Sequence, residues 1–418
     1  PITWLPAFIK GSKELASAYS TQMGLDDPAT SVPLALTALL LTLTGLVVSL
    51  WRRSPLAPAF LIAAFPVFVL YKGAVVRQSL GHFLCAWPVM VSLSALILAA
   101  ARRSFRPRVA WTLIVAGILA SGLYYAPASP YTVATRGARN WLALCNLKET
   151  RAEARRNDAN LKQSRPLPAS MLARIGDETV DIYPWEASYI WSNDLKWRPR
   201  PIFQSYTAYT PYLDQLCADL YRSPRAPKFI VYNHIAIDFE HPCIVDPRTW
   251  IEMYRWYDCV DQQDDMLLLE RRSEPRWTGA EKLTSSTLTF EKSYETPNPG
   301  QGLVFMKAKF ELSLLGKLQA FFYKVDPPLI RVDYMDGEPA NHRLVWQNTA
   351  GGFLLSSLPR DVNSVRRLFE TGVADPVAGV SFHDPSHRLK REFKVTALKS
   401  GAPAPAAVAA TAEAPAAH

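Results

Sequence analysis

Charged residues are missing from four long stretches near the beginning of the sequence. Uncharged runs of 24, 18, 24 and 27 residues occupy positions 28–51, 54–71, 78–101 and 109–135. Runs of about 18 or more apolar residues match the hydrocarbon thickness of a bilayer. The composition therefore argues against a disordered chain or a wholly soluble protein. We expect four transmembrane helices within residues 30–126, at about 30–51, 55–71, 83–101 and 109–126.

Short motifs with well-defined chemistry are also missing. The sequence contains no C-x-x-C, no G-x-G-x-x-G and no Walker A string, so zinc, thioredoxin-type redox and nucleotide-binding functions have no support. We therefore expect no cofactor. The string YNHIAIDFEH offers metal-capable residue types, but a solvated loop explains it better and we expect no metal. These residues are His234, Asp238, Glu240 and His241.

The positive charge of the first third follows membrane topology. Six arginines lie in two short loops between the uncharged runs, which predicts that both loops are cytoplasmic. They are Arg52, Arg53, Arg102, Arg103, Arg106 and Arg108. The net charge of +9 then indicates no nucleic-acid partner. Residues 1–28, the second hairpin and everything after about residue 127 should face outward, which predicts a multi-pass bacterial inner-membrane protein with a periplasmic C-terminal region.

The sequence begins at Pro1 without an initiator Met or signal peptide. We expect the C-terminal part of a longer membrane protein, with catalytic residues upstream of Pro1. Residues 1–29 are expected to form an outward loop with a short helix along the membrane surface; an ordinary connecting loop is the alternative. The bilayer is thus the first expected partner.

The outward hairpin YKGAVVRQSLGHF carries Lys72, Arg77 and His82 on the side where positive residues are scarce. Side chains of Lys and Arg near helix ends can extend to lipid headgroups without any further function. The functional alternative is that these cations bind the phosphate of a lipid carrier, with Gly73 and Gly81 permitting close backbone approach.

Beyond residue 127 we expect four further regions. Residues 127–166 should form a charged connecting helix, residues 167–275 an α/β domain with a largely parallel sheet, and residues 276–399 an antiparallel β-sandwich of jelly-roll type. The strands of these two domains include RPRPIF and LQAFFYKV, and VNSVRRLFET is expected to be helical. Residues 400–418 are rich in Ala and Pro and should be a disordered tail.

An oxidising compartment permits disulfides among the four cysteines of this region. Three pairings are possible, and Cys243 with Cys259 closes the shortest loop of the downstream pair. The four are Cys145, Cys217, Cys243 and Cys259.

Aromatic residues are dense between Tyr183 and Tyr212. Sugars stack their C–H faces on aromatic rings, while polar neighbours such as Asp181, Arg198 and Arg200 could bond hydroxyl groups; a structural core is the alternative. Ligands of α/β sheets bind beyond the carboxyl ends of strands. This rule favours a glycan site formed by Tyr183, Trp185, Glu186, Gln204 and Tyr206.

At YKGAVVRQSLGHF and at DIYPWEASYIWSNDLKWRPRPIFQSYTAYTPYLD the sequence resembles a group of uncharacterised polytopic bacterial inner-membrane proteins. They look like relatives of the GT-C glycosyltransferases, which use polyprenyl-phosphate-linked sugars at the outer face of the inner membrane. The resemblance covers residues 1–275 in arrangement. Because GT-C enzymes carry their catalytic acid in the first outward loop, which this chain does not contain, it assigns no catalytic residue here.

The resemblance implies a glycosyltransferase-like protein of cell-surface glycan assembly. Its partners would be a polyprenyl-phosphate-linked sugar and an acceptor glycan held by the periplasmic domains. The alternative is a non-enzymatic, membrane-anchored glycan-binding or scaffold protein of envelope polysaccharide assembly or export.

Overall fold

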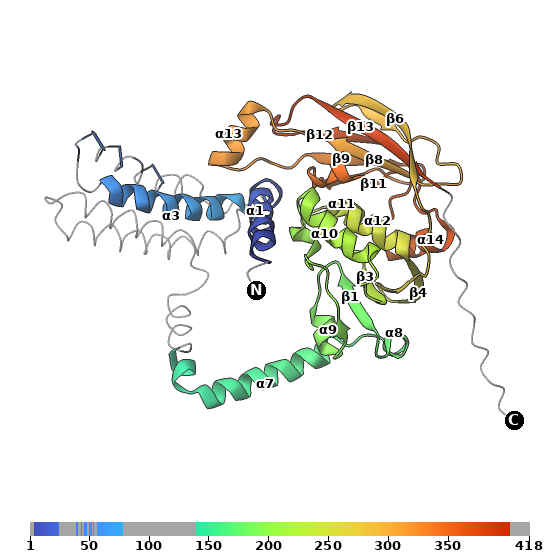
Figure 1. Cartoon of the computed structure of the whole chain (residues 1–418), viewed down its shortest axis with the longest axis horizontal. Coiled ribbons are helices and arrows are strands. Elements are labelled where there is room, and N and C mark those ends of the chain that lie inside the picture. The colour runs from blue at the N-terminus through green and yellow to red at the C-terminus, as the bar shows by residue number, and fades with distance from the viewer. Residues whose placement is uncertain are drawn as a thin grey trace. The chain divides into compact units, whose positions relative to one another are not determined.

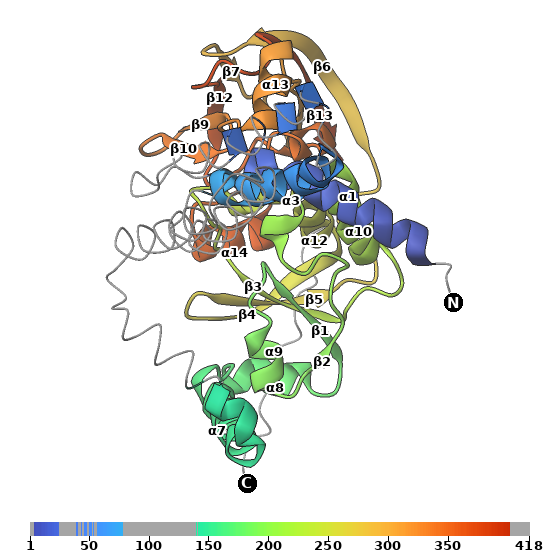
Figure 2. The same ribbon diagram turned by 90° about the vertical axis from the view of Figure 1, so that its left-hand side faces the viewer.

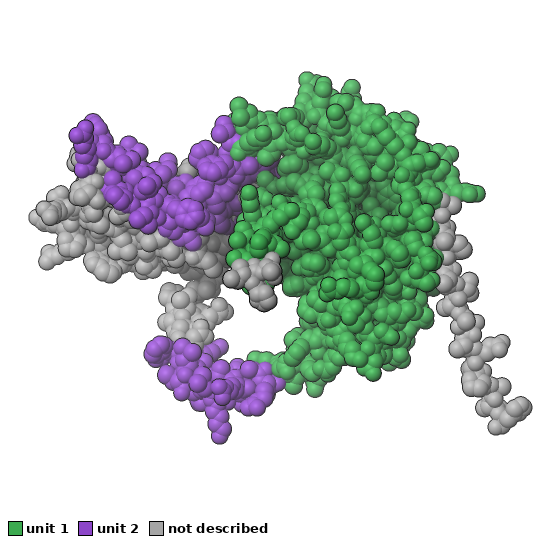
Figure 3. All heavy atoms as spheres, viewed as in Figure 1, with its two compact units in different colours: residues 1–22, 157–317, 327–418 green, residues 23–156, 318–326 purple. Residues whose placement is uncertain are grey.

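A computed structural model describes residues 4–24, 57–77 and 141–401, together with residue 139 and scattered positions between 39 and 53. The chain divides into two compact units (Figure 3). One contains residues 1–22, 157–317 and 327–418, and the other contains residues 23–156 and 318–326.

The prediction of four transmembrane helices is wrong as far as the structure extends. None of the described helices combines the length and the apolar content that crossing a membrane requires. The second expected span overlaps α3 (Ala57–Val76), which contains Pro66 and the charged Lys72. The third and fourth expected spans, and much of the first, lie outside the described residues.

A five-stranded sheet forms the centre of the α/β domain, in the order β2-β1-β3-β5-β4. Strand β1 pairs in parallel with β2 and β3, whereas β5 pairs antiparallel with β3 and β4, so the sheet is mixed rather than largely parallel. The strands are β1 (Thr179–Tyr183), β2 (Lys196–Trp197), β3 (Phe229–Asn233), β4 (Tyr257–Gln263) and β5 (Met266–Arg271).

Helices cover both faces of this sheet, α8 and α9 on one and α10 and α12 on the other (Figures 1 and 2). Because successive side chains of a strand point to opposite faces, each strand contributes to both cores. Val180 and Val231 pack in a cluster with α8 and α9, whereas Ile230 and Tyr232 belong to the larger core of α10 and α12. These helices are α8 (Ala169–Ile175), α9 (Ser188–Ser192), α10 (Pro211–Arg222) and α12 (Pro247–Trp256), and the short α11 (Pro242–Val245) precedes α12.

Eight strands form the second domain as two antiparallel sheets, β10-β9-β12-β7 and β11-β8-β13-β6. If the strands are numbered one to eight from β6 to β13, the first sheet reads 5-4-7-2 and the second 6-3-8-1. These are the two strand orders of a jelly roll. The strands are β6 (Ala280–Thr289), β7 (Ser293–Glu295), β8 (Val304–Lys309), β9 (Leu329–Tyr334), β10 (Ala340–Arg343), β11 (Phe353–Leu354), β12 (Val377–His383) and β13 (Glu392–Ser400).

Helix α14 (Val362–Thr371) lies where VNSVRRLFET predicts a helix, with Asp361 capping its start and Gly372 (φ 79°) ending it. Two strand predictions are wrong. LQAFFYKV lies mainly in helix α13 (Leu314–Phe322), whose start is capped by Ser313 Oγ accepting from Gly316 N at 3.0 Å. RPRPIF is a loop, since its two prolines have no N–H for a ladder and Arg200 is buried between them.

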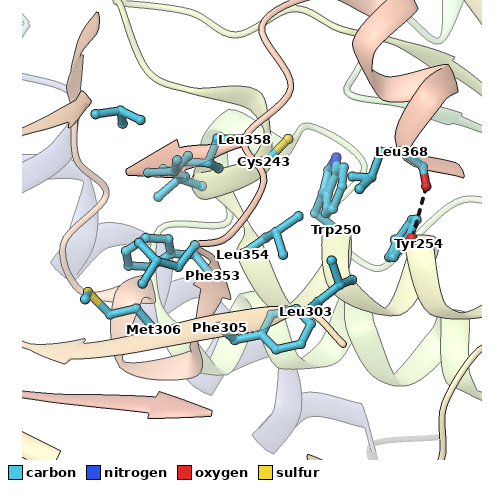
Figure 4. Packing of buried hydrophobic residues seen from close by; sticks show 14 of the residues in the cluster. Cys243, Trp250, Tyr254, Leu303, Phe305, Met306, Phe353, Leu354, Leu358 and Leu368 are labelled. Carbon is cyan, nitrogen blue, oxygen red and sulfur yellow. Dashed lines mark hydrogen bonds between the residues drawn. The ribbon is translucent and has the colours of Figure 1, made fainter. Parts of the chain in front are cut away.

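One apolar core continues from the α/β domain into the jelly roll (Figure 4). Trp250 and Tyr254 of α12 lie in the same cluster as Phe305 and Leu354 of the jelly roll. The Tyr254 hydroxyl donates to the Leu368 carbonyl at 3.1 Å. The two domains therefore form one packed body rather than modules on a linker.

Outside these domains, α1 (Leu5–Gln22) and α7 (Leu147–Ser164) are helical. Helix α7 carries no buried residue and matches the charged connecting helix expected between residues 127 and 166. All four candidate disulfide cysteines are free thiols, so the expected Cys243–Cys259 bond is not formed. The expected disordered tail lies outside the described residues beyond Gly401.

Two histidines of the α/β domain lie against the jelly roll, His241 buried and His234 partly exposed. His234 Nδ1 lies 2.7 Å from the Tyr232 hydroxyl, and its Nε2 lies 3.0 Å from the Pro359 carbonyl. The His241 ring lies edge to face with those of His234 and His342, at centroid distances of 5.8 and 4.9 Å. Burial lowers the pKa of His234 to about 4 and also lowers the pKa of His241 and His342.

These histidines make the stability sensitive to acid. Because the folded pKa of His234 lies below that of the unfolded chain, the unfolded chain binds more protons below about pH 6.5, and stability is lost as the pH falls toward 4. The wild-type free energy of unfolding should fall between pH 7 and pH 5, and we expect this fall to be about 2 kcal/mol smaller in His234→Gln, as measured by urea unfolding. His387→Gln, in an exposed loop, is the control. An unchanged pH dependence in His234→Gln would contradict this account.

Candidate functional site

The strand order reverses direction between β1 and β3, at their carboxyl ends. Strand β1 lies between β2 and β3, and the helices α9 and α10 that follow β1 and β2 pack on opposite faces of the sheet. Such a reversal of strand order opens a crevice where open α/β sheets bind ligands. The jelly roll lies against the β3 side of this edge, where His234 Nε2 is 3.0 Å from the Pro359 carbonyl. The loops after β1 and β2 form the other side.

Four of the five residues predicted to bind glycans lie on these loops. The rings of Trp185 and Tyr206 meet edge to face with centroids 5.3 Å apart. Glu186 and Gln204 adjoin them in the chain, and all four side chains are partly exposed. We call Trp185, Glu186, Gln204 and Tyr206 the aromatic edge. It combines apolar ring faces with a carboxylate and an amide.

Tyr183, the fifth predicted residue, lies beneath the aromatic edge. Its side chain is 1% exposed, and its ring stacks on Tyr232 at 5.5 Å. Its hydroxyl donates to Asp246 Oδ1 at 2.5 Å. Tyr183 is therefore a core residue that supports the loops and does not face a ligand.

Arg200 joins the two loops from below. Its Nη2 donates to the carbonyls of Pro184 at 2.9 Å and Phe203 at 2.8 Å, and its Nη1 donates to the Tyr221 hydroxyl at 2.8 Å. Ser205 N also donates to the Pro184 carbonyl, at 3.2 Å. Carbonyls on both sides of the aromatic edge are thus held by one guanidinium, which fixes the separation of Trp185 and Tyr206.

The sequence suggested that Asp181 and Arg200 could bond sugar hydroxyls, but both are buried. Asp181 Oδ2 lies 3.7 Å from Arg200 and accepts from the Tyr221 hydroxyl at 3.0 Å. Burial raises the pKa of Asp181, and the Arg200 guanidinium opposes that rise. The supporting role of Arg200 has only a weak sequence signal, its position between two prolines.

Two more carboxyl groups complete this buried network. Asp214 accepts from Arg248 N at 3.0 Å and Thr249 N at 2.9 Å, which caps the start of α12. Asp246 accepts from Tyr183, while its Oδ2 is buried with no partner among the described residues. Burial and, for Asp246, the charge of Asp214 raise the pKa of this pair. The network therefore retains a proton that the unfolded chain would release.

The residues predicted to bind lipid phosphate lie elsewhere. Lys72 Nζ donates to the Ala320 carbonyl at 2.9 Å and to the Tyr323 carbonyl, so it caps the end of α13, and burial lowers its pKa to about 8. Arg77 Nη1 lies 3.5 Å from Met23 Sδ. His82 lies outside the described residues. Phosphate binding by these three residues stays a prediction.

Metal-capable side chains do not assemble into a site in the part of the chain that the structure covers. No group of three or more His, Cys, Asp or Glu among the described residues is arranged to hold a metal ion. Asp238 instead pairs with Arg343 at 3.6 Å, and His241 Nδ1 accepts from Cys243 N at 3.1 Å.

Asp246 provides a test of the buried network. Its folded pKa is raised, so the folded chain binds more protons and its contribution to stability falls as the pH rises from about 4 through the folded pKa. Asp246→Asn imitates the protonated form. We expect its stability relative to wild type to increase by about 1.4 kcal/mol per pH unit from pH 5 up to the folded pKa of about 7, and to level off by pH 8, in urea unfolding. A difference that is constant with pH would show that Asp246 does not hold the proton.

In comparisons with known proteins, no family model matches the chain, and neither a curated protein nor a solved structure gives a match.

Proposed function

We propose that this chain binds a glycan at the aromatic edge and serves in the assembly of cell-surface polysaccharide. The observation that carries the proposal is the Trp185–Tyr206 pair at the sheet edge, held by the buried Arg200. Fixed rings suit the C–H faces of sugars, and Glu186 and Gln204 offer acceptors and donors for hydroxyl groups. Because the loops are already bonded to one another, little ordering cost falls on binding.

Trp185→Ala tests this proposal. Loss of the ring should lower affinity about tenfold, which corresponds to about 1.4 kcal/mol, because stacking disappears while Arg200 still holds the loops. The measurement is binding of the full chain to an array of bacterial cell-surface oligosaccharides. Trp191→Ala is the matched control, since Trp191 is 54% exposed on the neighbouring α9. Equal affinities of the two variants, or no binding by wild type, would refute the proposal.

Location at a membrane surface is the second part of the proposal. Trp4, Phe8 and Ile9 at the start of α1 are 59%, 61% and 56% exposed. The other end of α1 is held in place, since Gln347 Nε2 donates to Thr21 Oγ1 at 2.8 Å. Exposed aromatic and aliphatic residues beside lysine are typical of helices that lie in the bilayer interface.

The double variant Trp4→Ser, Phe8→Ser should reduce the fraction of the chain that sediments with phosphatidylglycerol vesicles. The expected cause is the loss of buried ring area at the lipid boundary. A control variant replaces two other exposed aromatics, Trp191→Ser with Phe239→Ser. If both double variants lose binding equally, α1 has no special role at the membrane.

Sugar transfer remains a proposal that derives from the GT-C resemblance alone. We assign no catalytic residue among the described positions. Transfer from a polyprenyl-phosphate-linked sugar to an acceptor, measured with the full-length protein, separates a transferase from a binding protein.

A further inference from the structure

A cavity of about 740 Å³ lies at one end of the jelly roll. It is bounded by the loop 296–302 between β7 and β8, by the end of α14, by Ser356 and Ser357 after β11, and by the start of β12 at Val377. Sites for small molecules commonly have volumes of about 300–1,000 Å³. None of the aromatic-edge residues lines this cavity.

Both charged side chains that line the cavity already have counter-ions. Arg276 Nη2 lies 2.6 Å from Asp258 Oδ1, and Arg276 Nε donates to the Tyr254 carbonyl. Glu370 accepts from Arg366 Nε at 2.6 Å. A charged ligand would therefore have to compete with an existing ion pair, so the lining favours a neutral ligand.

The cavity lining also contains uncharged polar side chains beside the apolar ones. Thr296 Oγ1 is buried and has no hydrogen-bond partner within the described residues, a state that is uncommon in folded proteins. Ser356 Oγ accepts from Val304 N at 3.0 Å, which leaves its O–H to donate. Gln301 adds an exposed amide at the rim. A ligand rich in hydroxyl groups, which both donate and accept, satisfies such a set.

The loop that forms one wall is closely packed against β13. A Cβ atom at Gly302 would lie 2.3 Å from the Ser400 carbonyl oxygen, and Gly300 has a positive φ of 54°. Both positions thus require glycine. Pro297 and Pro299 further restrict this loop, so the cavity wall is preformed.

We infer that this cavity is a second binding site, which takes a neutral saccharide of one or two sugar units. Hydroxyl groups of the sugar bond Ser356 and Gln301, and also Thr296 once its side chain turns Oγ1 from its buried position toward the cavity. The C–H faces of the sugar pack on the apolar lining of Leu303, Met335 and Val373. This inference extends the proposed glycan-binding function to a separate place on the chain.

Thr296→Val is the decisive variant, because valine keeps the shape of threonine and removes only the hydroxyl group without a partner. Affinity of the full chain for maltose, cellobiose and lactose is measured by calorimetry, with glucose 6-phosphate and glucuronic acid as charged comparators. We expect Thr296→Val to lower affinity for at least one neutral disaccharide about tenfold. Its urea midpoint should equal or exceed that of wild type, since no hydrogen bond is lost. Thr284→Val, at an exposed position of β6, is the control.

The same assay on Trp185→Ala separates this inference from the proposed function. Weaker binding in Thr296→Val and unchanged binding in Trp185→Ala supports the cavity as the site. Weaker binding in Trp185→Ala alone overturns the cavity and leaves the aromatic edge in place. No binding of the neutral disaccharides, a preference for the charged comparators, or a lowered urea midpoint in Thr296→Val also overturns it.

Discussion

The packing of α12 between the sheet and the jelly roll is the constraint on which the rest of this body depends. Trp250, Met253 and Tyr254 are all at most 1% exposed, and they belong to one cluster with residues of both domains. Truncating a buried Trp or Phe costs about 3–5 kcal/mol, a large part of a typical stability of about 5–15 kcal/mol. Polar contacts agree with this packing, because Asn348 Nδ2 donates to the carbonyls of Ala208 and Val245. The α/β domain therefore buries its α12 face only by packing against the jelly roll.

This packing also explains why the site edge has two unlike sides. The jelly roll packs at the end of β3, where His241 is buried and His234 is partly exposed, and burial lowers the pKa of both imidazoles. The β1 side is left to the loops that Arg200 supports. Burying a guanidinium is costly unless its donors are satisfied. Here two carbonyls and a hydroxyl accept from Arg200, and Asp181 at 3.7 Å supplies the opposite charge, while Nε has no partner among the described residues. The desolvation of Arg200 is unfavourable, but its hydrogen bonds keep the two loops at a fixed separation.

Local signals explain which elements could be predicted from the sequence. Thr210 with Pro211, and Asp361 with Gly372, mark helix ends by their own chemistry, and α10 and α14 lie where these residues place them. The short β-rich segments after residue 276, separated by Pro, Gly, Asp or Asn, form the strands of the predicted jelly roll. In LQAFFYKV the apolar residues fit either period, and the cap at Ser313 precedes the string. The transmembrane prediction rested only on the length and the low polarity of the uncharged runs. Among the residues that the structure describes, no helix is able to span a membrane.

Contacts between residues that are far apart in the sequence had no such local signal. Arg200 is buried because Tyr221 and the Pro184 carbonyl meet it, and only the folded chain brings His342 to His241. Composition correctly placed aromatic residues near the carboxyl end of β1, but it could not separate Tyr183, in the core, from Trp185, two residues further on at the edge. The cavity was missed altogether, since threonine, glycine and proline in a loop have no distinctive pattern.

The two proposed binding places differ in the part of a glycan that each could accept. The aromatic edge is formed by side chains on open loops, so a sugar in the middle of a long chain could lie across Trp185 and Tyr206 with both neighbours in solvent. The cavity is walled by two loop segments, a helix end and the start of β12, which suits a short sugar or the end of a chain. A protein that carries both could hold a polymer along its length at one place and bind its terminal units at another. Jelly rolls serve many functions, so this division of roles rests on the side chains of the two sites and not on the fold.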